Sequence, residues 1–164
     1  MILIAATPVK IGSDSYGEVT LESLEVLGSV KLNGTTISKR LLVTGHLIAS
    51  SAHLHEIEAE GDVKLKDSML QEQVSVTGSL QASGSEFCQP LILTGQKALF
   101  SKCKLSGITV RRDAAFKAKQ VIELKDRTIV EGPIAFEGGN GEVLLYAGSK
   151  IHGAVTGGKV THKN

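Results

Sequence analysis

The chain has 164 residues, of which 41% are hydrophobic and 21% charged, a composition that fits one globular domain with a buried core and excludes a disordered chain. Its 18 Lys and Arg residues nearly balance its 17 Asp and Glu residues and are scattered along the chain, which argues against nucleic acid as a partner because that binding needs clustered positive charge. Two cysteines are too few for a disulfide scaffold, and no apolar run approaches the roughly 20 residues that cross a bilayer.

The segment 1–23 contains short apolar pieces without a regular pattern. We predict that it forms an irregular first coil and an N-terminal cap. Ile2, Leu3 and Ile4 could cover an exposed strand edge, bring residues 1–6 to a membrane surface, or join a second molecule. This apolar start is shorter than the core of a secretory signal peptide, so we expect a cytoplasmic protein, or a periplasmic or extracellular one if the sequence is a trimmed mature form.

From residue 24 to residue 121 the sequence repeats with a near-constant period. Successive rows are 17, 16, 17, 17 and 17 residues long and begin at Leu24, Leu41, Ile57, Val74, Leu91 and Ile108. Two positions into each row stand Val26, Val43, Ala59, Val76, Leu93 and Val110. Four positions in stand Gly28, Gly45, Gly61, Gly78 and Gly95, with Arg112 as the exception. Later apolar columns are Val30, Leu47, Val63, Leu80, then Leu32, Ala49, Leu65, Ala82, Leu99, Phe116, and then Ile37, Leu54, Leu70, Phe87, Val121.

The alternation within each row indicates β-strand, because successive side chains leave a strand on opposite faces. A return to the same column after one row indicates one turn of a coil, in which like residues stack at the ~4.8 Å spacing of strands. We therefore predict an all-β fold, a β-solenoid with coils of about 17 residues. The glycine of each row marks a corner or bulge, and no segment carries a sustained helical period.

The pattern changes after Leu91. Lys97 falls in an inward column, and the later apolar residue of this row, Leu105, comes one position late, so we predict a slip in register near Cys103. Further along, the spacing of the glycine column lengthens between Arg112 and Gly132, which predicts a short insertion in the segment 122–127.

The C-terminal region is rich in glycine and less regular. We predict a single solenoid domain over residues 1–164, with a cap at 1–23, regular coils at 24–121, irregular coils at 122–160 and a polar tail at 161–164. The two ends supply the candidate residues for end capping or self-association, which are Ile2, Leu3, Ile4, Val143, Leu145 and Val155.

Two stretches, LLVTGHL at 41–47 and VSVTGSL at 74–80, place apolar residues around a central glycine. This arrangement of apolar residues around a glycine resembles that of the bactofilins, and the resemblance covers most of the regular rows. The resemblance implies a single-stranded, right-handed parallel β-helix and a bacterial cytoskeletal protein that polymerises without nucleotide by stacking one solenoid end on another. A left-handed hexapeptide helix needs a coil of roughly 18 residues. The rows of 16 and 17 residues fit that length poorly. The irregular C-terminal coils are more elaborate than a plain bactofilin core, and could be caps that prevent stacking.

Histidines and glycines give little sign of a bound ligand. His46, His53 and His55 lie close in sequence, but no acidic or sulfur ligand completes a recognisable metal pattern, so we predict surface histidines and no metal. The run Gly138–Gly141 does not follow a strand and open a helix as a phosphate loop does, so we predict no nucleotide and no cofactor.

One outward column could in principle carry catalysis, and it contains Ser29, His46, Asp62, Ser79, Gln96 and Asp113. Its two acids stand three coils apart, roughly 14 Å, beyond the separation used for glycoside hydrolysis. Arg111, Arg112 and Asp113 could cluster with Lys97, which a surface ion pair explains equally well. The hydroxyl column Thr44, Thr77, Thr94 is interrupted by Leu27, Glu60 and Arg111, and we expect it to stabilise neighbouring strands.

We therefore predict no catalytic residue and no small-molecule substrate. The leading hypothesis is a non-enzymatic scaffold that self-associates through its ends or a flat face, as a homo-oligomer or filament. The alternative is an envelope or surface module that holds a carbohydrate or a protein on one solenoid face. Cys88 and Cys103 fall at neighbouring positions of consecutive coils, where pairing is conceivable, and we expect reduced, partly buried thiols.

Overall fold

The computed structural model describes residues 3–4, 9–112 and 119–163, and within these ranges every regular element is a strand. In chain order the strands are β1 (Leu3–Ile4), β2 (Val9–Tyr16), β3 (Thr20–Asn33), β4 (Thr36–Ser50), β5 (His53–Lys66), β6 (Met69–Leu70), β7 (Val74–Ser83), β8 (Glu86–Phe87), β9 (Leu91–Thr94) and β10 (Lys97–Ser101). They continue as β11 (Lys104–Leu105), β12 (Ile108–Val110), β13 (Gln120–Lys125), β14 (Ile129–Val130), β15 (Ile134–Phe136), β16 (Gly141–Tyr146), β17 (Lys150–Ile151), β18 (Val155–Thr156) and β19 (Gly158–Lys163).

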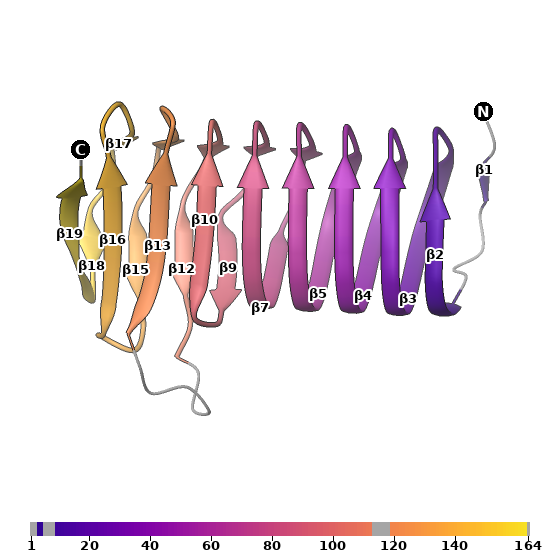
Figure 1. The fold of residues 1–164 in the computed structure, drawn as a ribbon, viewed down its shortest axis with the longest axis horizontal. Coiled ribbons are helices and arrows are strands. Elements are labelled where there is room, and N and C mark those ends of the chain that lie inside the picture. The colour runs from indigo at the N-terminus through magenta and orange to yellow at the C-terminus, as the bar shows by residue number, and fades with distance from the viewer. Residues whose placement is uncertain (1–2, 5–8, 113–118, 164) are drawn as a thin grey trace.

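The described chain winds as a right-handed β-solenoid of about nine turns, with its N-terminus at one end and its C-terminus at the other (Figure 1). Every strand pairing is parallel and joins one coil to the next. The predicted fold class and the predicted repeat length are therefore confirmed.

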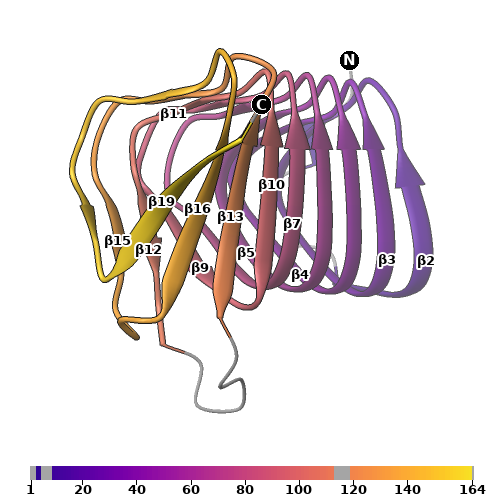
Figure 2. The ribbon, with the colours of Figure 1, turned by 60° about the vertical axis from the view of Figure 1, so that its left-hand side comes forward.

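Each coil has three faces, visible along the axis in Figure 2. The first face contains β9, β12, β15 and β18; the second face contains β10, β13, β16 and β19; the third face contains β1, β6, β8, β11, β14 and β17. In the N-terminal coils the strands β3, β4, β5 and β7 are longer, because each continues around a bend from the first face onto the second. The strands β3, β4 and β5 are longer still, because each begins on the third face.

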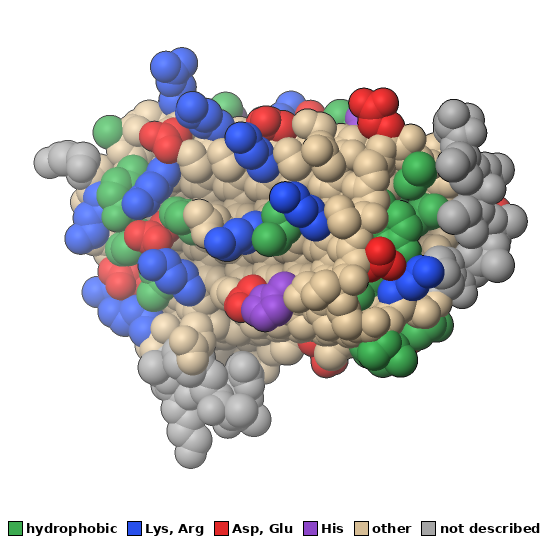
Figure 3. All heavy atoms as spheres, turned by 45° about the vertical axis from the view of Figure 1, so that its right-hand side comes forward, with side chains coloured by type: hydrophobic (Ala, Val, Ile, Leu, Met, Phe, Trp, Pro, Cys, Tyr) green, Lys and Arg blue, Asp and Glu red, His purple; other side chains and the backbone are tan. Residues whose placement is uncertain are grey.

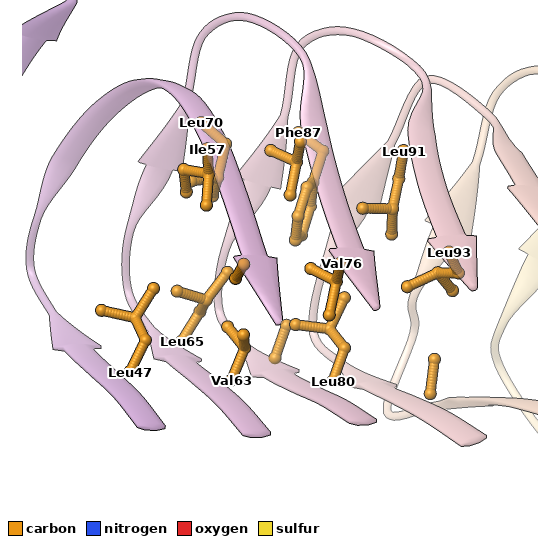
Figure 4. Close-up of a cluster of buried hydrophobic side chains, with 14 of the residues drawn as sticks. Leu47, Ile57, Val63, Leu65, Leu70, Val76, Leu80, Phe87, Leu91 and Leu93 are labelled. Atoms are coloured by element: carbon orange, nitrogen blue, oxygen red, sulfur yellow. The ribbon is translucent and has the colours of Figure 1, made fainter. Parts of the chain in front are cut away.

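The core lies inside the coils, where the columns predicted from the sequence become vertical stacks. Leu47, Val63 and Leu80 form one such stack and are 1–2% exposed; Figure 4 shows them along one side of the interior, opposite Ile57, Leu70 and Phe87. The rings of Phe87 and Phe100 meet edge to face with centroids 5.9 Å apart. Stacked aliphatic side chains fill this interior and leave the outer faces to carry polar groups.

The predicted glycine column also forms a stack, at the bend between the first and second faces. Gly45 pairs with Gly61, and Gly61 with Gly78. Gly61 has φ = 128°, a conformation that residues with a Cβ rarely adopt, and a Cβ there would overlap the carbonyl oxygen of Gly45. Glycine is needed at this bend for both reasons.

A second stack, which the sequence did not reveal, closes the corner between the second and third faces. Its buried members are small and mostly carry a hydroxyl group: Thr35, Ala52, Ser68, Ser85, Cys103, Thr128 and Ser149. The backbone N–H of Ala52 donates to Ser68 Oγ (3.2 Å), that of Ser68 to Ser85 Oγ (3.2 Å), and that of Thr128 to Ser149 Oγ (3.1 Å). Each of these three hydroxyl groups thus satisfies a buried N–H group of the preceding coil.

The two cysteines do not pair: both are free thiols, and only Cys103 is buried. Cys103 belongs to the corner stack, and burial raises the pKa of its thiol. Cys88 is exposed, contrary to the expected partial burial, and its carbonyl accepts a hydrogen bond from Ser106 (2.9 Å).

The slip in register is present, but it lies earlier than predicted. Thr94 pairs with Thr77 at the regular repeat, whereas Ala98 pairs with Leu80, so the separation between partners has grown by one position. The extra residue is therefore at 95–97 and not near Cys103. As a consequence Lys97 points outward, and Phe100 takes the inward position expected for Leu99.

The insertion also lies elsewhere. Val110 pairs with Leu93 and Ile122 pairs with Ala98, so the chain between Val110 and Ile122 is longer by seven positions than the stretch it stacks on. Residues 122–125 belong to β13 and not to a loop. The inward column expected to contain Val121 contains Val130 instead, while Phe116 and Asp113 lie outside the described residues.

Candidate functional site

The N-terminal end of the solenoid is formed by β1 and β2. Leu3 and Ile4 pair with Thr20 and Leu21 on the third face, and the third candidate of this end, Ile2, lies outside the described residues. Within the described chain, β2 pairs with β3 and leaves its other edge without a partner strand.

Two charged residues occupy inward columns in this first coil. Lys10 lies in register with Val26, and Asp14 with Val30. The carboxylate of Asp14 accepts hydrogen bonds from Tyr16 Oη (3.2 Å) and from the backbone N–H of Ser15 (2.9 Å). Partial burial, followed by the nearby Asp14 charge, raises the pKa of Tyr16. Charged residues at inward positions disfavour indiscriminate pairing of an open edge.

The C-terminal end is formed by β17, β18 and β19, each of which pairs on one side only within the described residues. Val155 lies in this last coil and is half-buried. Val143 is fully buried, one coil further in, in register with Val160. Leu145 is half-buried opposite His162. Of the three C-terminal candidates, only Val155 therefore belongs to the outermost strands.

The two ends carry opposite charge. Residues 9–25, which form the first coil and the start of the second, contain four acids and one lysine, a formal net charge of −3. The charged residues are Lys10, Asp14, Glu18, Glu22 and Glu25. Residues 147–163 contain three lysines and no acid, a formal net charge of +3 before either histidine is counted; the lysines are Lys150, Lys159 and Lys163. The overall net charge of +1 hides this polarity.

Glu142 fastens the last coil to the one before it. Its carboxylate accepts a hydrogen bond from Thr161 Oγ1 (2.6 Å) and lies 3.2 Å from Lys119 Nζ and 3.9 Å from Lys159 Nζ. The Thr161 hydrogen bond, followed by that of Lys119, lowers the pKa of Glu142. The carboxylate is therefore held ionised between the two cations.

The second face contains an open trough of about 790 Å³ that runs along the solenoid axis. We call it the second-face trough. Most of its side chains come from two outward rows: Ser13, Ser29, His46, Asp62, Ser79 and Lys97 on one side, and Lys31, Ile48, Lys64, Gln81 and Leu99 on the other. Asp14 of the first coil also lines the trough. Figure 3 shows this face as a hollow surface bordered by basic side chains and a histidine.

Polar groups inside the trough are partly linked to one another. Ser79 Oγ donates to Asp62 Oδ1 (2.5 Å), and His46 Nδ1 lies 3.4 Å from Asp62 Oδ2. Lys97 Nζ contacts Glu123 Oε2 (3.2 Å) beyond the end of the trough. Within the described residues, neither Lys31 nor Lys64 forms an ion pair with an acidic side chain.

The outward column predicted from the sequence is correct for its first four members. Its next member is Lys97 and not Gln96, because the register slips at this point. Asp113 lies outside the described residues, while Arg111 and Arg112 are exposed after β12. Lys97 pairs with Glu123, a contact that the sequence did not indicate.

The three neighbouring histidines have separate surroundings. His46 borders the second-face trough, whereas His53 and His55 lie in β5 at the third face, where His55 Nδ1 contacts the carbonyl oxygen of Ile37 (2.9 Å). In the described ranges no three His, Cys, Asp or Glu side chains are grouped as a metal site would require.

Exposed apolar side chains gather near the N-terminal end. Ile11 is 84% exposed and Val9 56%, and both lie in β2 beside Leu27 of β3. Figure 3 shows hydrophobic side chains at this end of the molecule. This group lies at the edge of the first coil.

No protein-family model, curated protein or solved structure matches the chain. Within the described residues, no helix has the length and apolar character to cross a membrane.

Proposed function

We propose that this protein is a non-enzymatic scaffold that self-associates head to tail, so that the C-terminal coil of one copy continues into the N-terminal coil of the next. The opposite charge of the two open ends is the observation that carries the proposal. The assembly is of the kind that the resemblance to bactofilins implies.

The backbone supports this arrangement. An edge strand offers a row of N–H and C=O groups to another strand, and β19 and β2 are the outermost strands of the second face at the two ends. Both run in the direction shared by all other coils, so a parallel continuation needs no reversal of the chain. A contact between unlike ends is heterologous, and when its rotation does not close a ring it generates a filament.

Charge selects head to tail over the alternatives. Joining two C-terminal ends would bring together lysines from both copies, and joining two N-terminal ends would bring together acids. Only the unlike pairing places a charge of −3 beside one of +3. Complementary charge speeds association and suppresses wrong partners.

A continued register also gives Asp14 a partner. The columns align Gly158 with Gly12 and therefore Val160 with Asp14, because the inward column of the second face passes through both. His162 then lies diagonally opposite Asp14, at a separation that long side chains bridge in neighbouring strands. The inward carboxylate of Asp14 disfavours pairing with a purely apolar edge strand, but it can contact His162 at the C-terminal end of another copy.

Sedimentation velocity over a concentration series tests the proposal. We expect the sedimentation coefficient to rise with protein concentration at low salt and to fall as salt screens the ends. Lys150→Glu with Lys163→Glu should weaken association at least about tenfold, and neither lysine has an acidic partner within the described chain. Lys66→Glu with Lys104→Glu is the matched control, because both lysines are exposed on middle coils.

A monomer at every concentration would overturn the proposal and would favour the irregular terminal coils as caps. Association that both pairs of substitutions weaken equally would also overturn it, since the ends would then have no special part.

A further inference from the structure

The second-face trough carries two lysines in one outward row. Lys31 and Lys64 lie two coils apart, so the two cations are roughly 10 Å apart along the axis. Lys97 lies in the other row and pairs with Glu123. Ile48, 45% exposed, stands between Lys31 and Lys64. An elongated ligand along the axis would therefore meet a cation, then an apolar contact, then a cation.

The trough cannot bind an extended peptide by adding a strand. Strand addition needs unpaired backbone groups at a sheet edge, whereas the coils beneath the trough are paired on both sides, as β4 is with β3 and β5. A ligand there is held by side chains alone. The side chains that line the trough include hydroxyl, amide and ammonium groups, which suit a polymer rich in hydroxyl groups.

Single-stranded nucleic acid fits poorly. Proteins that hold it combine a continuous basic groove with aromatic side chains on which bases stack. No Phe, Tyr or Trp lines the trough, and Asp14 and Asp62 place carboxylates within it.

We propose that the second-face trough binds one chain of an acidic polysaccharide, with its carboxylates beside Lys31 and Lys64 and its hydroxyl groups on Ser29, Ser79 and Gln81. Lys31 and Lys64 supply the affinity, because within the described residues their charges are not compensated by an acid. The spacing favours a polymer with a carboxylate on every second sugar over one with a carboxylate on every sugar. The site does not depend on self-association.

Calorimetric titration tests the site with four probes: hyaluronan oligosaccharide, with a carboxylate on alternate sugars; polygalacturonate oligosaccharide, with one on each sugar; maltodextrin, which is neutral; and oligothymidylate. We expect hyaluronan to bind most tightly and more weakly as salt rises. Lys31→Gln with Lys64→Gln should lower its affinity at least about tenfold. Asp62→Asn should raise it, because a like charge is removed.

Lys66→Gln with Lys104→Gln is the matched control and should leave the affinity unchanged, since Lys66 follows Lys64 in β5 but lies outside the trough. Circular dichroism establishes that each variant is folded. The proposal is overturned if hyaluronan does not bind, if maltodextrin, polygalacturonate or oligothymidylate binds as tightly, or if the Lys31 and Lys64 substitutions have no more effect than the control pair.

Discussion

The N-terminal coils, residues 20–94, and the C-terminal coils, residues 97–163, build the same solenoid by different means. In the N-terminal coils one long strand covers two or three faces and bends at a glycine, which lies directly under the glycine of the next coil. In the C-terminal coils each face has its own short strand, and loops of different length join them. Backbone stacking demands a strict repeat, whereas corners made by loops and side chains tolerate insertions.

Gln120 marks the change from one kind of corner to the other. It is 5% exposed, and its Nε2 donates to the carbonyl oxygens of Gly95 (2.9 Å) and Arg111 (3.0 Å). In the preceding coils, each glycine of the column lies next to the glycine of the following coil. Next to Gly95 lies the side-chain amide of Gln120 instead. The glycine stack therefore ends in a polar cap.

The two regions also differ in surface charge. On the second face of the N-terminal coils, Lys31 and Lys64 face the open trough. On the same face of the C-terminal coils, lysines are paired with acids across coils, as Lys97 is with Glu123 and Lys119 with Glu142. The N-terminal coils leave cations available for a ligand, and the C-terminal coils use cations to hold irregular segments together.

The largest effect is expected where the repeat is strictest. Gly61→Ala should lower the free energy of unfolding by roughly 3 kcal/mol or more, because it combines an unfavourable backbone conformation with overlap onto the preceding coil. Urea denaturation followed by circular dichroism measures this loss. Gly17→Ala is the control, since a Cβ there meets no atom within 4 Å. Equal stability of the two variants would refute the need for glycine at the bend.

A smaller loss is expected at the cap of the glycine stack. Gln120→Leu keeps the volume but leaves two carbonyl oxygens without their donor, so unfolding should become easier by about 2 kcal/mol. Gln96→Leu, at an exposed position of the preceding coil, should change stability by less than about 0.5 kcal/mol. If both variants are equally stable, Gln120 does not separate the two regions as described.

The corner stack runs through both regions and should respond more modestly. Ser68→Ala removes the acceptor of the Ala52 N–H group and should lower the free energy of unfolding by about 1 kcal/mol. Ser75→Ala, on a half-exposed strand position, is the control. A neutral Ser68→Ala would mean that the stack contributes shape alone.

The smallest and most local effect concerns the last coil. Because the pKa of Glu142 is lowered in the folded protein, its stabilising contribution is present above the ordinary carboxylate range and is lost as pH falls through the lowered value. Hydrogen exchange of β19 amides should therefore quicken as pH falls below the ordinary titration range of a glutamate carboxyl group. Glu142→Gln should quicken it at neutral pH, and Glu137→Gln, at an exposed position, should not. Unchanged exchange in the Glu142 variant would contradict this role.

The sequence predicted the repeated part of the fold because a strict period exposes every column at once. It misplaced the slip and the insertion, since Leu99 and Phe116 continue the apparent apolar column of the sequence beyond the position where the register changes. The corner stack escaped notice because serine, threonine and alanine are also ordinary turn residues. The outward row from Ser29 to Ser79 was identified, but the trough required knowledge of which second row lies beside it.

Charge at the two ends could have been counted from the sequence, yet it has meaning only once those segments are known to form opposite ends of one rod. The apolar residues predicted for self-association do not all lie at the ends of the solenoid. Val143 lies in the core and Val155 in the last coil, because the segment 156–163 adds one more strand to the second face.

Mixing two charge variants tests the head-to-tail account most directly. Lys150→Glu with Lys163→Glu makes both ends acidic, whereas Glu18→Lys with Glu25→Lys makes both ends basic. We expect each variant alone to sediment as a monomer, and an equimolar mixture to regain the concentration-dependent association of the parent chain. A mixture that remains monomeric while the parent chain associates would contradict the account.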